Sequence, residues 1–252
     1  MDDDFDLFGA TTASERASAD ELYKQRRNAQ RASLDDVQDQ LTFQRRRYLQ
    51  SDQHPPGVLG FETLRSARPL NFGELFSLSE RQAILASVYD HVSAHEWTTQ
   101  RHGAFPTRDI PVCATSVADM VAGRLRDQLF PWLQARTGID VGFWAFRDLF
   151  VVGYHEDHQR ALDLHSDGCL ASLTLLLNDP AEFEGGGTLF DKFGLLVRHA
   201  PGDAWIHDGK LRHGAAEIAR GQRVVMVAFF DTVGGQTTAL ARHRIGDCPA
   251  PS

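Results

Sequence analysis

Short apolar runs separated by Gly, Asp and Asn turns fill the chain from residue 141 onward, and this texture restricts the possible folds more than any other feature. Runs rich in β-branched and aromatic residues, closely spaced and bounded by turns, are typical of β-strands in sandwiches and barrels rather than of βαβ units. We therefore expect a mainly β protein with flanking helices, and specifically a double-stranded β-helix (jelly roll). The predicted strands cover residues 142–145, 148–154, 170–177, 187–190, 194–198, 203–207, 213–219 and 222–231.

The residues before this β-rich region predict helices that pack on the outside of the barrel. Residues 79–95 carry apolar side chains at helical spacing. A second helix is predicted from an N-cap at Ser116 to about Arg136, with Gly138 ending it. Pro131 falls inside this pattern and is expected to kink or split the helix. Residues 97–115 contain Gly103, Pro106 and Pro111 and indicate a loop or short strand.

The first 78 residues predict an extension of different character. Residues 18–50 lack Gly and Pro and indicate one long helix, or two that are broken near residue 33, whereas residues 51–78 indicate an irregular connection. Acidic residues mixed with Phe and Leu near the N-terminus are typical of a disordered tail, which either keeps the chain in solution or docks a protein partner. We divide the chain into five regions. These are an acidic tail (1–17), a helical N-terminal extension with its linker (18–78), supporting helices (79–140), a double-stranded β-helix core (141–235) and a C-terminal tail (236–252).

Composition excludes several classes of protein. A formal net charge of -8 argues against a nucleic acid as partner. Three cysteines without a C-x-x-C pair predict no disulfide framework, as in a reducing compartment. We find no apolar run of the roughly 18 residues that a membrane span requires, and no signal-peptide pattern. The sequence thus predicts a cytoplasmic or nuclear protein that does not bind membranes.

Three side chains in the β-rich region have the pattern of a metal site. Side chains two residues apart on a strand lie on one face, so His165 and Asp167 can reach one point together. His213, from a distant strand, supplies a third ligand. Two imidazoles and one carboxylate with open positions opposite them are the ligands of non-haem Fe(II) oxygenases. The competing candidates among the eleven histidines are His155, His158, His199 and His207.

Arg223 lies ten residues after His213 and is expected on the next strand, beyond a turn near residues 219–221. An Fe(II) centre of this kind needs a two-electron co-substrate. A 2-oxo acid can bind such a metal through its keto and C1 carboxylate oxygens, and its distal carboxylate then requires a fixed cation. The planar guanidinium of arginine suits a bidentate carboxylate contact. The alternative reading of Arg223 is a surface residue at a hairpin.

These motifs together resemble the prolyl/lysyl hydroxylase superfamily of Fe(II)- and 2-oxoglutarate-dependent dioxygenases, with the closest likeness to the catalytic domain of lysyl hydroxylases. The likeness covers about residues 148–232. It is carried by the triad and by Phe150-Val151-Val152-x-Tyr154, Gln159 with Leu162, Leu177-Asn178, Phe183-Glu184-Gly185-Gly186-Gly187-Thr188-x-Phe190, Pro201-x-Asp203, His207-x-Gly209-x-Leu211, Gly221-x-Arg223 and Phe230-Asp231.

The resemblance implies a role for each matched residue. His165, Asp167 and His213 would bind Fe(II), and Arg223 would bind the distal carboxylate of 2-oxoglutarate. Two further residues are expected to contact the co-substrate, namely Tyr154, whose alternative is a core aromatic, and Thr174. Some related enzymes have a tyrosine near position 176, where this chain has leucine.

The resemblance also implies a reaction. With O2 as oxidant and ascorbate (vitamin C) as reductant, the protein would hydroxylate an unactivated C–H and release succinate and CO2. The expected substrate is a prolyl or lysyl side chain in a protein, or a small amino-acid-like molecule. Related halogenases lack the carboxylate that Asp167 supplies, and oxidative nucleic-acid demethylases have an arginine where this chain has Phe229. The alternative from another class is a non-catalytic jelly roll that binds metal or ligand as a sensor or scaffold.

Overall fold

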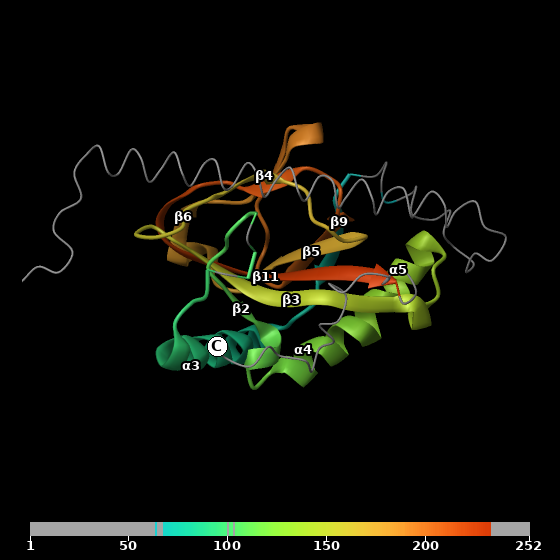
Figure 1. Cartoon of the computed structure of the whole chain (residues 1–252), viewed down its shortest axis with the longest axis horizontal. Helices are drawn as coiled ribbons and strands as arrows, with labels where there is room; N and C mark the ends of the chain where they lie inside the picture. The colour runs from blue at the N-terminus through green and yellow to red at the C-terminus, as the bar shows by residue number, and fades with distance from the viewer. Residues whose placement is uncertain (1–63, 65–67, 100, 103, 233–252) are drawn as a thin grey trace, which may run out of the picture.

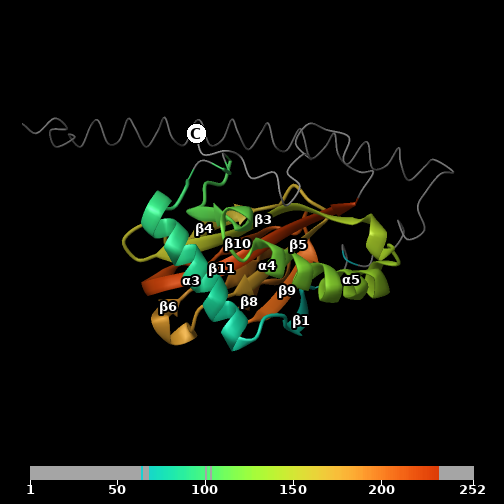
Figure 2. The ribbon, with the colours of Figure 1, turned by 90° about the horizontal axis from the view of Figure 1, so that it is seen from below.

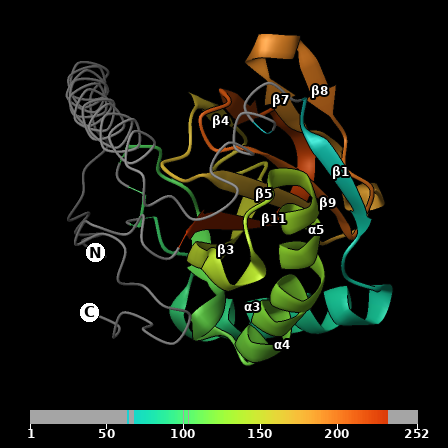
Figure 3. The same ribbon diagram turned by 90° about the vertical axis from the view of Figure 1, so that its right-hand side faces the viewer.

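The computed structural model describes residues 64, 68–99, 101–102 and 104–232. They form three layers, in which helices cover one face of a large antiparallel sheet and a smaller sheet covers the other (Figures 1 and 3). This confirms the predicted mainly β fold with flanking helices, and it is a jelly roll. The predicted acidic tail, the N-terminal helices of residues 18–50 and the C-terminal tail lie outside the described residues.

Two sheets make up the barrel. In the described chain the larger sheet has seven strands in the order β1-β9-β5-β11-β3-β2 with β6 beside β11, and the smaller has four in the order β4-β10-β7-β8. Strands far apart in sequence are therefore neighbours in space. The strands span β1 Leu70–Glu74, β2 Asp109–Pro111, β3 Trp144–His155, β4 Leu162–His165, β5 Ala171–Leu176, β6 Phe183–Gly185, β7 Thr188–Phe190, β8 Leu195–Val197, β9 Asp203–Asp208, β10 His213–Ala215 and β11 Ile218–Thr232.

The central strand β11 shows why the large sheet has two apolar faces. Alternate side chains of β11 pack in the main core against the helices, namely Val224, Met226, Ala228 and Phe230. Val225 instead joins a second cluster that includes Phe150 of β3. Successive side chains on a strand point to opposite faces, so an almost continuous apolar run is required when both faces are covered. Arg223 has the parity of Val225 and therefore points between the two sheets, into the barrel.

Helices of the described chain cover the outer face of the large sheet, as Figure 2 shows from that side. The first, α3 (Leu78–His95), begins with a capping box between Ser77 and Glu80. The next two are α4 (Ala118–Arg124) and α5 (Phe130–Thr137), joined by a π-helical turn over Leu125–Leu129. Among the described residues, no helix is both long and apolar enough to cross a membrane.

The helix predictions hold in outline and fail in one detail. Pro131 lies in the first turn of α5, where proline needs no N–H partner, so the expected break is present. Gly138 ends α5 in a left-handed conformation, as expected. Ser116, however, is not the N-cap. Its hydroxyl contacts Ser87 of α3 at 2.8 Å, and α4 begins from Val117 without a side-chain cap.

The strand predictions need four corrections. Residues 142–145 and 148–154 belong to a single strand, β3, after a 3₁₀ turn at Val141–Phe143. The turn expected near residues 219–221 lies inside β11, which passes through them with Gly221 at φ 77°. β4 and β6 are short and lie in stretches where no strand was predicted. The prediction of an irregular connection over residues 51–78 is wrong for residues 70–74, which form β1 beside β9. The division into regions stays a prediction.

Candidate metal centre and co-substrate pocket

Three predicted ligands meet where the two sheets open. β4 ends with His165 and β10 begins with His213, and the two residues are paired across these strands. Asp167 follows β4 and is held by its backbone N–H, which donates to Gly209 O at 2.7 Å. The Nε2 atoms of His165 and His213 lie 3.4 and 3.5 Å from the two carboxylate oxygens of Asp167. All three ligand atoms lie within 4.8 Å of one another.

The hydrogen bonds of both histidines leave their metal-binding atoms free to face the carboxylate. His165 Nδ1 lies 2.7 Å from Asp163 O, and His213 Nδ1 lies 2.9 Å from Leu211 O. A carbonyl only accepts, so Nδ1 carries the proton and Nε2 of a neutral ring presents a lone pair. Two lone pairs and a carboxylate directed at one point repel one another unless a cation lies between them. The donor set therefore fits a divalent metal, and its two nitrogens and one oxygen fit Fe(II).

Burial and charge favour the protonation states that a metal requires. Burial lowers the pKa of His213 to about 3, against the opposing effect of Asp167, so this imidazole is neutral at pH 7. Burial alone would raise the pKa of Asp167, but the positive charge that His213 or His165 carries when protonated outweighs burial and holds the pKa below its usual range. The carboxylate is therefore ionised.

Arg223 forms a buried cationic site inside the barrel. It lies opposite Tyr154 across β11 and β3, and its guanidinium carbon lies 5.6 Å from the centre of that ring. The residue is only 2% exposed, and burial lowers the pKa of its guanidinium. Its Nη2 has no hydrogen-bond partner, and it makes no ion pair within the described part of the chain. A buried cation without a counter-ion is costly, so this geometry indicates an anion-binding position.

Tyr154 and Thr174 line the same interior. Burial raises the pKa of Tyr154 to about 12, so its hydroxyl stays protonated and can donate a hydrogen bond. Thr174 of β5 lies opposite Trp205 of β9 and has the parity of Leu176, which packs in the inner cluster. The wall at position 176 is thus apolar where some related enzymes have tyrosine.

The structure separates the competing histidines. The His207 ring is buried and its centre lies 4.3 Å from that of His213, so it borders the metal centre without joining the ligand set. His155 ends β3, and His158 is exposed in the turn beyond it; their rings contact each other at 5.3 Å. His199 is buried and contacts Thr188, and it is not part of the ligand set.

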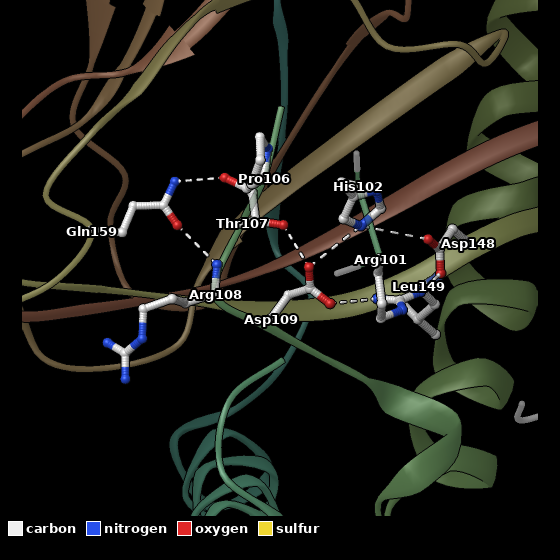
Figure 4. A network of polar contacts seen from close by, with 9 residues as sticks. All are labelled: Arg101, His102, Pro106, Thr107, Arg108, Asp109, Asp148, Leu149 and Gln159. Carbon is white, nitrogen blue, oxygen red and sulfur yellow. Dashed lines mark hydrogen bonds and ion pairs between the residues drawn. The ribbon is translucent and has the colours of Figure 1, made fainter. Parts of the chain in front are cut away.

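A polar segment before β2 packs against the site, and nothing in the sequence pattern singles it out. The ring of Phe105 lies 4.8 Å from that of His165, and His102 lies 4.5 Å from Phe150. Figure 4 shows how this segment is held. Arg101 bridges two carboxylates, with Nη1 2.7 Å from Asp109 and Nη2 2.6 Å from Asp148.

Solved structures with this arrangement of strands include several oxygenases. A viral collagen prolyl hydroxylase from Paramecium bursaria Chlorella virus-1, in complex with 2-oxoglutarate, matches with a TM-score of 0.51 and 15% identity, over 67% of this chain and 98% of its own. A Pseudomonas putida prolyl-4-hydroxylase matches with a TM-score of 0.52 and 15% identity, over 69% of this chain and 97% of its own. SnoN, a non-haem α-ketoglutarate-dependent epimerase of nogalamycin biosynthesis, matches with a TM-score of 0.52 and 14% identity, over 68% of this chain and 79% of its own.

No protein-family model matches this sequence, and a comparison with curated protein sequences gives no significant match. Identities near 15% show a common fold and no more. The likeness to the lysyl hydroxylase branch in particular stays a prediction. The chain has the jelly-roll fold of the 2-oxoglutarate- and Fe(II)-dependent oxygenases.

Proposed function

We propose that the protein is an Fe(II)- and 2-oxoglutarate-dependent dioxygenase that hydroxylates an unactivated C–H. The observation that carries this proposal is the convergence of His165, Asp167 and His213 on one point, with both Nε2 lone pairs directed at the carboxylate. The guanidinium of Arg223 lies in the same barrel, its Nη2 has no hydrogen-bond partner among the described residues, and this supports a dicarboxylic co-substrate.

The residues of the site fall into two groups, one that holds the metal and one that holds the anionic co-substrate. His165, Asp167 and His213 would hold Fe(II), and the co-substrate and O2 would bind to the same ion. Arg223 binds the distal carboxylate of 2-oxoglutarate, and the protonated hydroxyl of Tyr154 donates to the co-substrate. Thr174, whose side chain points into the same interior, contacts the co-substrate. When bound, Fe(II) and 2-oxoglutarate supply the oxidising chemistry, in which O2 is divided between succinate and the hydroxylated product.

The barrel interior protects this chemistry from water. Phe150, Val225 and Leu176 are each 3% exposed or less and form an apolar wall on the large sheet. Phe105 covers the outer side of His165. A dry site strengthens the contact between Arg223 and a carboxylate, and it limits side reactions when no substrate is bound.

We propose further that the substrate is a prolyl or lysyl side chain of a protein, or a small amino-acid-like molecule, and that ascorbate serves as reductant. The prolyl hydroxylases among the structural neighbours support the first part by analogy. A cytoplasmic or nuclear location and a partner for the N-terminal segment remain predictions. A succinate-release screen across peptide and amino-acid pools, followed by mass spectrometry for a product heavier by one oxygen, identifies the substrate.

The test of the proposal uses the full chain, Fe(II) and 2-oxoglutarate without oxygen. We expect a visible metal-to-ligand charge-transfer band that is lost in His165→Ala. In Arg223→Ala, which loses a charged hydrogen bond, we expect 2-oxoglutarate affinity to fall by about 100-fold while Fe(II) affinity is retained. A folded protein without the band contradicts the cofactor assignment. A band without succinate release on any substrate pool favours the non-catalytic binding module.

A further inference from the structure

Asp167 differs from the other two predicted ligands because strand pairing does not set its place. His165 and His213 are cross-strand neighbours in the small sheet. Asp167 instead lies in the loop of residues 166–170, which leaves β4 of the small sheet and enters β5 of the large one. Alternation directs side chains only within a strand, so contacts from other elements have to fix this loop and its carboxylate.

The turn after β9 holds one side of this loop. Besides the hydrogen bond from Asp167 N to Gly209 O, Gly209 N donates to Leu170 O at 3.2 Å. The hydroxyl of Ser166 donates to Lys210 O at 3.1 Å. These bonds fix the first and last residues of the loop, and its middle is held from the opposite side.

The ends of β3 and β11 form that opposite side, and here two charged side chains take part. Leu170 N donates to Asp231 Oδ1 at 3.1 Å, and Arg147 Nη1 donates to the backbone oxygen of Gly168, the residue next to the ligand. The same Nη1 lies 3.4 Å from Asp231 Oδ2. Arg147 and Asp231 therefore form an ion pair that holds the loop at two backbone positions.

A β-bulge directs Arg147 toward this loop. Phe229 of β11 is paired with Asp148 of β3, and Phe230 is paired with Phe146, which leaves Arg147 as the extra residue between them. A bulge re-aims a side chain that regular pairing would direct elsewhere. The irregularity in β3 thus has a local consequence, which is the contact between the guanidinium and the loop that carries Asp167.

We propose that Arg147 and Asp231 are positioning residues of the metal centre, which hold the loop so that the Asp167 carboxylate meets the two imidazoles. The inference rests on the proposed function and adds two residues to it. The carboxylate and the imidazole lone pairs repel one another when no cation lies between them, so a loop without these contacts would carry Asp167 away. Holding the loop in advance lowers the cost of bringing the ligands together when the metal binds.

The test is Mn(II) binding to the full chain, followed by the electron paramagnetic resonance signal of the free ion. Arg147→Met keeps much of the apolar stem and removes both polar contacts, and it is expected to weaken Mn(II) binding by about tenfold or more, as is usual for groups that orient a ligand. Arg147→Lys should recover most of the affinity. A single nitrogen, Nη1, makes both contacts, so the single ammonium of lysine can replace it.

Arg160→Met is the matched control. Arg160 Nε donates to Ile218 O at 3.1 Å and lies 3.1 Å from Glu217 Oε1, so it also joins a backbone oxygen to a carboxylate, but neither partner belongs to the Asp167 loop. Both methionine variants should lower the free energy of unfolding of the metal-free protein, measured with urea. Only Arg147→Met should weaken Mn(II) binding.

Wild-type Mn(II) affinity in Arg147→Met, or an equal loss of affinity in the control, overturns the positioning role. Circular dichroism checks that each variant folds, and Asp231→Ala decides in the same way if Arg147→Met does not. Failure of the proposed function looks different, because the wild-type protein would then bind no Mn(II) that His165→Ala abolishes. That result overturns the metal centre and this inference with it.

Discussion

At the scale of single residues, Arg223 depends on the glycine two positions before it. Gly221 lies within β11 at φ 77°, a left-handed conformation that favours glycine. A Cβ at this position would lie 2.0 Å from the backbone oxygen of Glu182. The missing side chain thus lets β6 and its preceding turn approach β11 closely, just where the strand brings Arg223 into the barrel.

We predict that Gly221→Ala lowers the free energy of unfolding by about 3 kcal/mol or more, because a close backbone contact adds to the cost of the strained conformation. Gly194→Ala is the matched control, since Gly194 has φ 55° but nothing within 4 Å of an added Cβ. It should cost about 1 kcal/mol. Urea unfolding of both variants measures the difference, and equal losses would show that the Glu182 contact relaxes freely.

At the scale of elements, the segment before β2 is fastened to the sheet at two places, as Figure 4 shows. Gln159, beyond β3, donates to Pro106 O at 2.9 Å and accepts from Arg108 N at 2.8 Å. Asp109 of β2 accepts from Arg101 and from Thr107. Because Phe105 lies between these fastenings, they support the aromatic contact with His165.

The two ion pairs of Arg101, with Asp109 and with Asp148, should contribute unequally to the free energy of unfolding. Asp109 has a fully buried side chain, whereas the side chain of Asp148 is 22% exposed. Breaking a buried pair leaves an uncompensated charge, so we expect Asp109→Asn to cost about 3 kcal/mol of stability and Asp148→Asn about 1 kcal/mol. Thermal unfolding of the two variants, which change the same chemical group, provides the comparison. A larger loss in Asp148→Asn would contradict this ranking.

At the scale of the whole molecule, buried neutral histidines make stability depend on pH. The pKa of His199 falls from 6.5 to about 3 on burial, so between these values the unfolded chain binds more protons than the folded one. Stability therefore rises with pH across this window and is lost as the pH falls through it. For metal-free protein we predict a loss of about 2 kcal/mol from this residue between pH 7.5 and pH 5.

Urea unfolding at the two pH values measures the loss, and His199→Gln should show a smaller difference because glutamine does not titrate. The buried imidazoles of His207 and His213, whose pKa values are also lowered, act in the same direction. A free energy of unfolding that is the same at both pH values would show that His199 is protonated without cost in the folded state.

Local patterns in the sequence determined the class of fold and the identity of the candidate ligands. A period of two identifies strands and the face on which each side chain lies, and this is enough to place His165 and Asp167 together. Short apolar runs bounded by turns indicated the strands of a sandwich or barrel. Boundaries were less accurate, because β4 and β6 are too short to show a period and the bend in β11 at Gly221 has the composition of a turn.

Only the tertiary structure decided which distant residues meet. The pairing of His213 with His165, the packing of Arg223 against Tyr154 and the contact between Thr188 and His199 each join separate parts of the chain. Register depends on how whole strands pack, and shifting it by one residue would reverse every side chain. The position of the segment that carries Phe105 also depends on tertiary contacts. Hydrogen bonds to β3 and to Gln159 hold this segment, and no periodicity in its own sequence predicts where it lies.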